Sequence, residues 1–282
     1  MQRIVFRRIT IMILSCLIAV GCATQKSDFD NLSEEELYQK ARQHMIARRF
    51  IKAQEAYQML ESRFPFGKYA EQSQLEIISA HYQSNEYDLA IAAAGRFIRL
   101  HPDHPEVDYA FYYKGLSNFD ANRTLFDRFF MMDLSERDPG AARDAFNDFA
   151  ELVSRYPESR FASDSRARMI FLKNIMARHE IHVANYYFKR GAYTAAANRG
   201  RFVVEHFQET SSVADGLAIM VQAYRLLDMP DLAKDSLVIL KQNYPNHESL
   251  DASGNFMDKF SIEEAEKART VKGSSDSFGT KK

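Results

Sequence analysis

The sequence predicts an all-α protein built from stacked helical hairpins, because one motif returns at nearly fixed intervals. In each copy a helix-like segment ends in an aromatic ring that precedes proline, with one glutamine replacement, at intervals of 37, 55, 51 and 37 residues. The copies are Phe64-Pro65, His101-Pro102, Tyr156-Pro157, Phe207-Gln208 and Tyr244-Pro245. A period of about 34 residues plus a short linker is typical of tetratricopeptide repeats, in which each unit is a pair of helices.

Composition agrees with this fold class. The chain is 46% hydrophobic and 12% aromatic, and it contains only 7 prolines and 11 glycines, so long helices with a substantial core are feasible. A single hairpin cannot bury its own apolar face, whereas stacked hairpins share one core and leave a long concave surface. We therefore expect a right-handed superhelix of five tetratricopeptide hairpins that works by holding other polypeptide chains.

The first residues have the features of a targeting segment. Three arginines precede an apolar run at residues 9–20, which is too short to span a bilayer, since a spanning helix needs about 20 apolar residues. Residues 19–22 resemble a bacterial lipobox, in which the signal is cut before Cys22 and the thiol is acylated. Cys16 is a weaker alternative lipidation site, and an ordinary secretory signal is another interpretation of the segment.

This segment leads to a domain and localisation prediction. We expect a lipoprotein signal peptide at 1–21 and a lipidated tether at 22–31, with diacylglycerol and an N-acyl chain on Cys22. Ala23 rather than aspartate follows the cysteine, which favours sorting to the outer membrane. The predicted location is therefore the periplasmic face of the outer membrane, with the protein held there by its lipid.

The sequence excludes several classes of function. Both cysteines fall within the first 22 residues, so the mature chain has neither a disulfide nor a thiolate metal site. A net charge of −1 gives no basic excess for binding nucleic acid. The chain has no phosphate-binding Gly-rich loop and no Gly-x-Ser-x-Gly elbow, and His179 and His182 lack the spacing of a zinc protease. We expect no catalytic residues, no metal and no cofactor beyond the covalent lipid.

The repeat domain is predicted to span residues 32–250. A capping box at Ser33 and Glu36 begins the first helix. An insertion at about 123–140 lengthens the third unit, and the first helix of the fourth unit is predicted to run through Tyr187. Residues 251–282 are predicted to form a C-terminal tail that is partly disordered, because aromatic residues become sparse and Gly and Ser accumulate.

The concave surface is the predicted binding site. In the tetratricopeptide template, positions 2, 5, 9 and 12 of the first helix of each unit face the concave side. In the first three units these positions give the substrate-groove candidates Tyr38, Arg42, Met45, Leu75, Tyr82, Tyr109, Tyr112 and Phe119. Aromatic side chains with a polar tip suit the binding of extended or amphipathic peptides. The alternative is that several of them simply pack between adjacent repeats.

A second candidate lies on the second helix of the fourth unit. Arg199, next to Asn198, is predicted to be exposed and free to bind a carboxylate of a partner protein. The alternative is an ordinary solvent-facing helix residue.

Several segments together resemble the BamD (ComL) family of lipoproteins. They are RFPFGKY at 63–69, RFIRLHP at 96–102, KGLSN at 114–118, ERDP at 136–139, FLK at 171–173 and VANYY at 183–187. The similarity covers about residues 30–245 and includes the insertion, which a generic repeat protein would not reproduce. The chain departs from the family at Gln208, where relatives commonly have proline, and its tail is its own.

The resemblance implies a non-enzymatic subunit of the machine that assembles β-barrels in the outer membrane. It implies that N-terminal repeats recognise unfolded outer-membrane protein chains and that C-terminal repeats bind the POTRA region of BamA. It also implies that Asn198 and Arg199 lie at the contact with BamA, and that the lipoproteins BamC and BamE bind alongside. The alternative is another periplasmic repeat adaptor, such as a CpoB-like coordinator of cell division, although such proteins usually lack a lipobox. A cell-wall enzyme with a helical accessory domain would need a catalytic domain for which the chain has no room.

Overall fold

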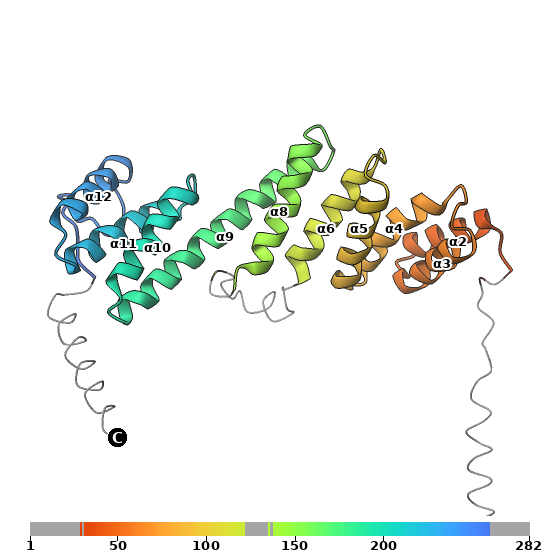
Figure 1. The fold of residues 1–282 in the computed structure, drawn as a ribbon, viewed down its shortest axis with the longest axis horizontal. Helices are drawn as coiled ribbons and strands as arrows, with labels where there is room; N and C mark the ends of the chain where they lie inside the picture. Colours follow the sequence, from red (N-terminus) through yellow and green to blue (C-terminus); the bar gives the residue numbers. More distant parts are fainter. Residues whose placement is uncertain (1–28, 30, 122–134, 136–137, 260–282) are drawn as a thin grey trace, which may run out of the picture. The chain divides into compact units, whose positions relative to one another are not determined.

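A computed structural model describes residues 29, 31–121, 135 and 138–259. Over these ranges the chain is all-α, with ten helices that follow one another as five hairpins (Figure 1). The hairpins are α2 (Glu34–Ile46) with α3 (Phe50–Arg63), α4 (Ala70–Gln83) with α5 (Tyr87–Leu100), α6 (Val107–Ala121) with α8 (Gly140–Arg155), α9 (Ala162–Lys189) with α10 (Tyr193–His206), and α11 (Ser212–Leu226) with α12 (Pro230–Asn243). The predicted fold class is confirmed, and α9 has the predicted length. Cys22, the signal peptide, most of the insertion and residues 260–282 lie outside the described part.

The chain divides into two compact units within α4, after Gln74. The first unit contains α2 and α3, and the second contains α5 to α12 together with the later part of α4. The prediction that residues 32–250 form one five-repeat superhelix stays a prediction.

The aromatic residue of the repeated motif ends the second helix of every hairpin. Each of the five residues is a C-cap whose amide donates to the carbonyl four positions earlier, at 2.8–2.9 Å, and whose φ lies between −117° and −135°. The residues are Phe64, His101, Tyr156, Phe207 and Tyr244. Because proline disfavours the helical conformation of the residue before it, the proline reinforces the stop. The backbone at Phe207 is similar although Gln208 follows, so the motif does not require proline.

The turn between the two helices of a hairpin also repeats. In the first, second, fourth and fifth hairpins one residue adopts a left-handed conformation, with φ between 55° and 68°. These residues are Arg48, Asn85, Gly191 and Asp228. In each turn the next amide donates back to a carbonyl five residues earlier, at 2.8–2.9 Å, which satisfies the end of the first helix. The hairpins are therefore repeats in backbone conformation as well as in sequence.

The first unit begins with the predicted capping box. The Ser33 amide donates to Glu36 Oε2 at 2.8 Å, and Ser33 Oγ accepts from the Glu36 amide at 3.4 Å. The hydrogen bond from the Ser33 backbone holds the pKa of Glu36 below its usual value. Phe29 is buried, with its ring 6.0 Å from that of His44 and its carbonyl bonded to Arg63. The predicted polar tether therefore does not extend through Phe29, because an aromatic ring there finds an apolar site.

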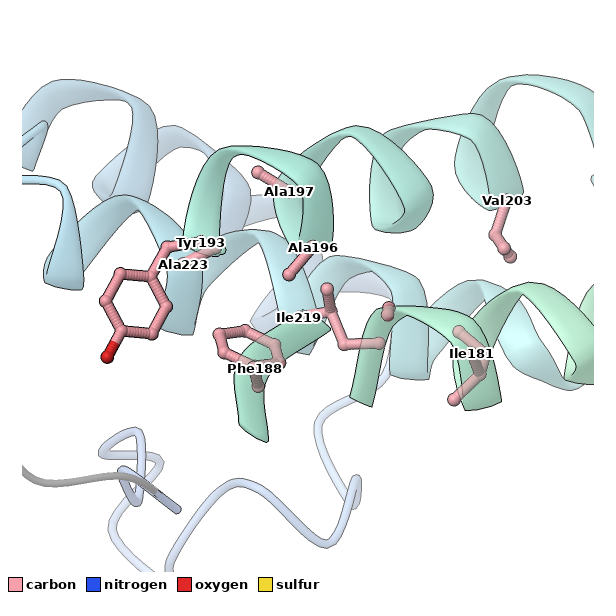
Figure 2. Packing of buried hydrophobic residues seen from close by; sticks show 9 residues of the cluster. Ile181, Phe188, Tyr193, Ala196, Ala197, Val203, Ile219 and Ala223 are labelled. Atoms are coloured by element: carbon pink, nitrogen blue, oxygen red, sulfur yellow. The ribbon is translucent and has the colours of Figure 1, made fainter. Parts of the chain in front are cut away.

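The second unit has a core that runs from one hairpin to the next. Figure 2 shows the part of this core where α9, α10 and α11 meet, with Phe188 of α9 beside Ala196 of α10 and Ile219 of α11. Small residues at these helix crossings let the backbones approach closely. None of the described helices is both long enough and apolar enough to cross a membrane.

Candidate polypeptide-binding surface

Aromatic rings gather in two contacting groups on α4, on α6 and at α9 of the second unit. We call this set the aromatic strip; it consists of Tyr82, Tyr109, Tyr112, Tyr113, Phe119, Phe161 and Phe171. The ring of Tyr113 lies 5.4 Å from that of Tyr82 and 4.5 Å from that of Tyr109. The ring of Tyr112 stacks on Phe161 at 4.5 Å. All seven side chains are half-buried or exposed, so the strip offers ring surface to a ligand.

Carboxylates hold the polar edge of the strip. The Tyr82 hydroxyl donates to Asp120 and the Tyr112 hydroxyl donates to Asp164, both at 2.7 Å. Partial burial, followed by the hydrogen bond to Asp164, raises the pKa of Tyr112 to about 12. Burial and Asp120 likewise raise the pKa of Tyr82. Both hydroxyls donate to these carboxylates, and the two hydrogen bonds hold the rings in position.

One arginine links the two ends of the strip. Arg168 Nε donates to Asp164 at 2.6 Å, and the Arg168 guanidinium lies 5.9 Å from the Phe119 ring. Phe119 in turn contacts Phe171 edge-on, at 5.9 Å between ring centres. The strip is thus a rigid, amphipathic surface with both aromatic and charged groups.

The structure brings together four of the eight groove candidates. Tyr82, Tyr109, Tyr112 and Phe119 all belong to the strip. The prediction for Leu75 is wrong, since its side chain is 2% exposed and packs in the core with Ile78, Ala94 and Phe97. For Leu75 the alternative interpretation is correct: the side chain packs between helices and does not line a groove.

The other three candidates lie in the first unit. Tyr38 is buried and stacks on Tyr69 at 4.4 Å, so only part of its ring edge is available. Arg42 is exposed, with its guanidinium 6.0 Å from the Tyr38 ring, and Met45 is half-buried. These side chains form a small local surface and remain candidates.

Sequence reasoning missed part of the strip. Asp164 and Phe171 occupy template positions 2 and 9 of α9, counted from Ser163, and Arg168 lies between them. The same count that found Tyr109 and Tyr112 in the third unit would have found Asp164 and Phe171 in the fourth, whereas Arg168, Tyr113 and Phe161 lie at none of the template positions.

The partner-binding candidates lie on α10. Arg199 Nη1 donates to Glu180 Oε2 of α9 at 2.9 Å, and this bond raises the pKa of the guanidinium. Arg199 is exposed as predicted, but it is already paired with a carboxylate of its own chain. The side chain is still 42% exposed and has further N–H donors. Asn198 is exposed and accepts a hydrogen bond from Arg201 at 3.0 Å.

The two histidines considered as zinc ligands have another role. His179 Nδ1 lies 2.8 Å from the carbonyl oxygen of Ser135, and His182 Nε2 lies 2.9 Å from the Ser135 hydroxyl. They attach this residue of the insertion to α9. Within the described ranges no group of three or more His, Cys, Asp or Glu side chains is arranged to hold a metal ion.

Stacked hairpins with an aromatic surface are typical of proteins that bind other polypeptide chains. The family model YfiO, described as an outer membrane lipoprotein, matches residues 30–239. The chain belongs to this family, the BamD family of outer-membrane protein assembly factors, which are non-enzymatic lipoproteins of the outer membrane.

Individual relatives agree with this assignment. The chain is 42% identical over 245 residues to outer membrane protein assembly factor BamD of Neisseria gonorrhoeae, covering 85% of this chain and 92% of the relative. It is 33% identical to BamD of Xylella fastidiosa (strain Temecula1 / ATCC 700964), covering 85% of this chain and 82% of that one. A solved tetratricopeptide repeat protein from Parabacteroides merdae ATCC 43184 matches at a TM-score of 0.33 and 12% identity, over 76% of this chain and 67% of that one. A likeness this distant adds nothing to the fold described above.

Proposed function

We propose that this protein is the scaffold and substrate-binding subunit of the β-barrel assembly machine, and that the aromatic strip binds unfolded outer-membrane protein chains. The observation that carries the proposal is the set of rings on α4, α6 and α9, two of which are held by Asp120 and Asp164, and all of which keep part of their surface accessible to solvent. Rings of this kind supply contact area at little cost in side-chain entropy. Membrane-facing strands are rich in apolar and aromatic side chains that suit such a surface.

Removing two rings from the strip should weaken substrate binding. We expect the double variant Phe119→Ala/Phe171→Ala to bind a labelled, urea-unfolded outer-membrane barrel about tenfold more weakly, because each lost aromatic contact is worth about 0.5–1.5 kcal/mol. Fluorescence anisotropy after dilution of the urea measures the affinity. Tyr186→Ala removes an exposed ring of α9 outside the strip and is the matched control, expected to bind like the parent. Equal affinity of the double variant and the control would count against the strip as the binding surface.

We further propose that Asn198 and Arg199 contribute to the contact with the POTRA region of BamA, with BamC and BamE binding elsewhere on the array. The bond to Glu180 supports this by fixing the guanidinium while leaving donors free for a second carboxylate. Acylation of Cys22 would confine the array to the membrane surface, which raises its effective concentration near a membrane-embedded partner.

Arg199→Ala should therefore reduce capture of a soluble POTRA fragment of BamA. We expect a loss of about tenfold or more, since a charge-assisted hydrogen bond is worth about 1.5–3 kcal/mol. Lys234→Ala is the control, because Lys234 is an exposed cation on α12 and lies outside the proposed contact. Biolayer interferometry compares the two variants at one salt concentration. If both variants lose affinity equally, the net positive charge of the protein, and not Arg199 itself, accounts for binding to the POTRA fragment.

A further inference from the structure

The chain continues past the last helix into a small folded element, residues 247–259, which we call the C-terminal hairpin. Leu250 and Phe256 form an antiparallel bridge, and the Met257 amide donates to the Ser249 carbonyl at 2.8 Å. At the tip, Asp251 Oδ1 accepts from the amides of Ser253 and Asn255 at 2.8 and 2.7 Å. The hairpin therefore closes on itself, although the sequence predicted that this region begins a partly disordered tail.

The hairpin lies on the face of α11 that the tetratricopeptide template assigns to the concave side. Counted from Ala214, template positions 2, 5, 9 and 12 are Asp215, Ala218, Gln222 and Arg225. His247 Nε2 lies 3.2 Å from Asp215 Oδ1, and the Lys259 amide donates to Gln222 Oε1 at 2.8 Å. Arg225 Nη1 donates to Asp258 Oδ2 at 2.7 Å. Every polar position of the series thus binds the hairpin.

These contacts are of the type that binds a peptide. Gln222 accepts a hydrogen bond from a backbone amide, Asp215 accepts one from a side-chain donor, and Arg225 donates to a carboxylate. The Arg225 guanidinium also lies 5.0 Å from the Phe256 ring. These contacts are like those that hold an extended peptide in a groove, except that the bound segment here belongs to the same chain.

Leu250 anchors the start of the hairpin, since it is buried and packs with Leu217 and Leu240, whereas the contacts beyond it are mostly polar. Arg225 and Asp258 remain 35% and 41% exposed in their side chains, and an ion pair at this exposure contributes about 1 kcal/mol or less. A partly open pocket remains beneath the hairpin, lined by Ile181, Asn185 and Phe188 of α9, by Ile219 of α11 and by Phe256. Beyond Leu250 the hairpin therefore fits the face without filling it, and Phe256 is the main apolar side chain that opposes release of residues 251–259.

We propose that the concave face of α11 is a peptide-binding surface and that the C-terminal hairpin is its resident occupant, which an incoming polypeptide displaces. The partner is an extended segment that offers a donor to Asp215, a backbone amide to Gln222 and a carboxylate to Arg225. A tethered occupant has an effective concentration in the millimolar range, so the face opens only to a competitor that is tight or locally concentrated. The inference goes beyond the proposed function and does not depend on what binds the aromatic strip.

The test uses the full mature chain and changes only the hairpin. His247→Ala/Asp258→Lys removes the contact with Asp215 and repels Arg225, so it should release the hairpin while leaving α11 intact. The matched control is Glu248→Gln, since Glu248 bonds only to Lys259 within the hairpin and both side chains are exposed. The probe is a labelled synthetic peptide with the sequence of residues 245–259. Fluorescence anisotropy measures its binding, and amide hydrogen exchange at Met257 and Lys259 reports whether the hairpin is released.

The expected result is faster exchange at both amides and at least about tenfold tighter peptide binding for the double variant than for the parent. The control should match the parent in both measurements. Release of the hairpin without binding of the peptide would overturn the proposal, because α11 would then have no affinity for a peptide of this sequence. Unchanged exchange would overturn it as well, since the contacts with Asp215 and Arg225 would then not hold the hairpin.

Discussion

Replacing Phe149 by alanine should lower the free energy of unfolding by about 3–5 kcal/mol, the range for a large aromatic side chain lost from a core. The Phe149 side chain is fully buried and packs with Leu116 of α6 and Leu172 of α9. On α6, a Cβ at Gly115 would lie only 2.7 Å from the Phe149 ring, so the ring fills the space that this glycine leaves. The surrounding helices can close the resulting cavity only by moving together.

The same substitution should also loosen the aromatic strip. Tyr82, Tyr112 and Phe119 pack against the cluster that contains Phe149, and the Tyr112 ring centre lies 6.2 Å from that of Phe149. Urea unfolding followed by circular dichroism gives the loss of stability. Phe66→Ala is the control, because the Phe66 side chain is 99% exposed and its removal should change stability by no more than about 0.5 kcal/mol. A loss of less than about 1 kcal/mol at Phe149 would contradict the packing described here.

Much of the fold follows from local sequence signals. The aromatic residues of the repeated motif end five helices, four of them before a proline, and Ser33 with Glu36 begins another helix. These residues act on their own backbone or on neighbours within one turn. Interactions of such short range are visible in a sequence. The same locality explains why the first helix of the fourth hairpin was predicted at its observed length.

The candidate sites were less predictable because they depend on contacts between helices. Leu75 has the template position of a groove residue, yet Ile78, Ala94 and Phe97 bury it. Arg199 was expected to be free, but Glu180, on the preceding helix, supplies its carboxylate.

The order in the C-terminal hairpin depends on contacts of still longer range. The polar composition near Ser253 predicted disorder, and the apolar residues there have no periodic spacing that would predict a helix or a strand. Asp215, Gln222 and Arg225, all more than 30 positions away from their partners along the chain, hold the hairpin in place. Local sequence patterns do not reveal such pairs.

Replacing Gly200 by alanine should lower the free energy of unfolding by about 1–3 kcal/mol, the cost of forcing an extra methyl group into a packed contact. A Cβ at Gly200 of α10 would lie 2.6 Å from the backbone oxygen of Gly216 on α11 and 2.9 Å from Ile219 Cγ2. A backbone oxygen cannot turn aside as a side chain can, so the helices must separate. Gly95→Ala is the matched control: nothing lies within 4 Å of its Cβ position, and alanine there should raise stability by about 0.5–1 kcal/mol.

The reciprocal variant distinguishes a backbone contact from an ordinary loss of packing. A Cβ at Gly216 would lie 2.9 Å from the backbone oxygen of Gly200, so Gly216→Ala strains the same helix crossing from the other side. Once one methyl group has separated α10 from α11, the second meets less resistance. We therefore expect the double variant to lose less stability than the sum of the two single losses, by about 0.5 kcal/mol or more in urea unfolding. Additive losses would mean that each glycine is confined by its own neighbours and that the two helices do not meet backbone to backbone.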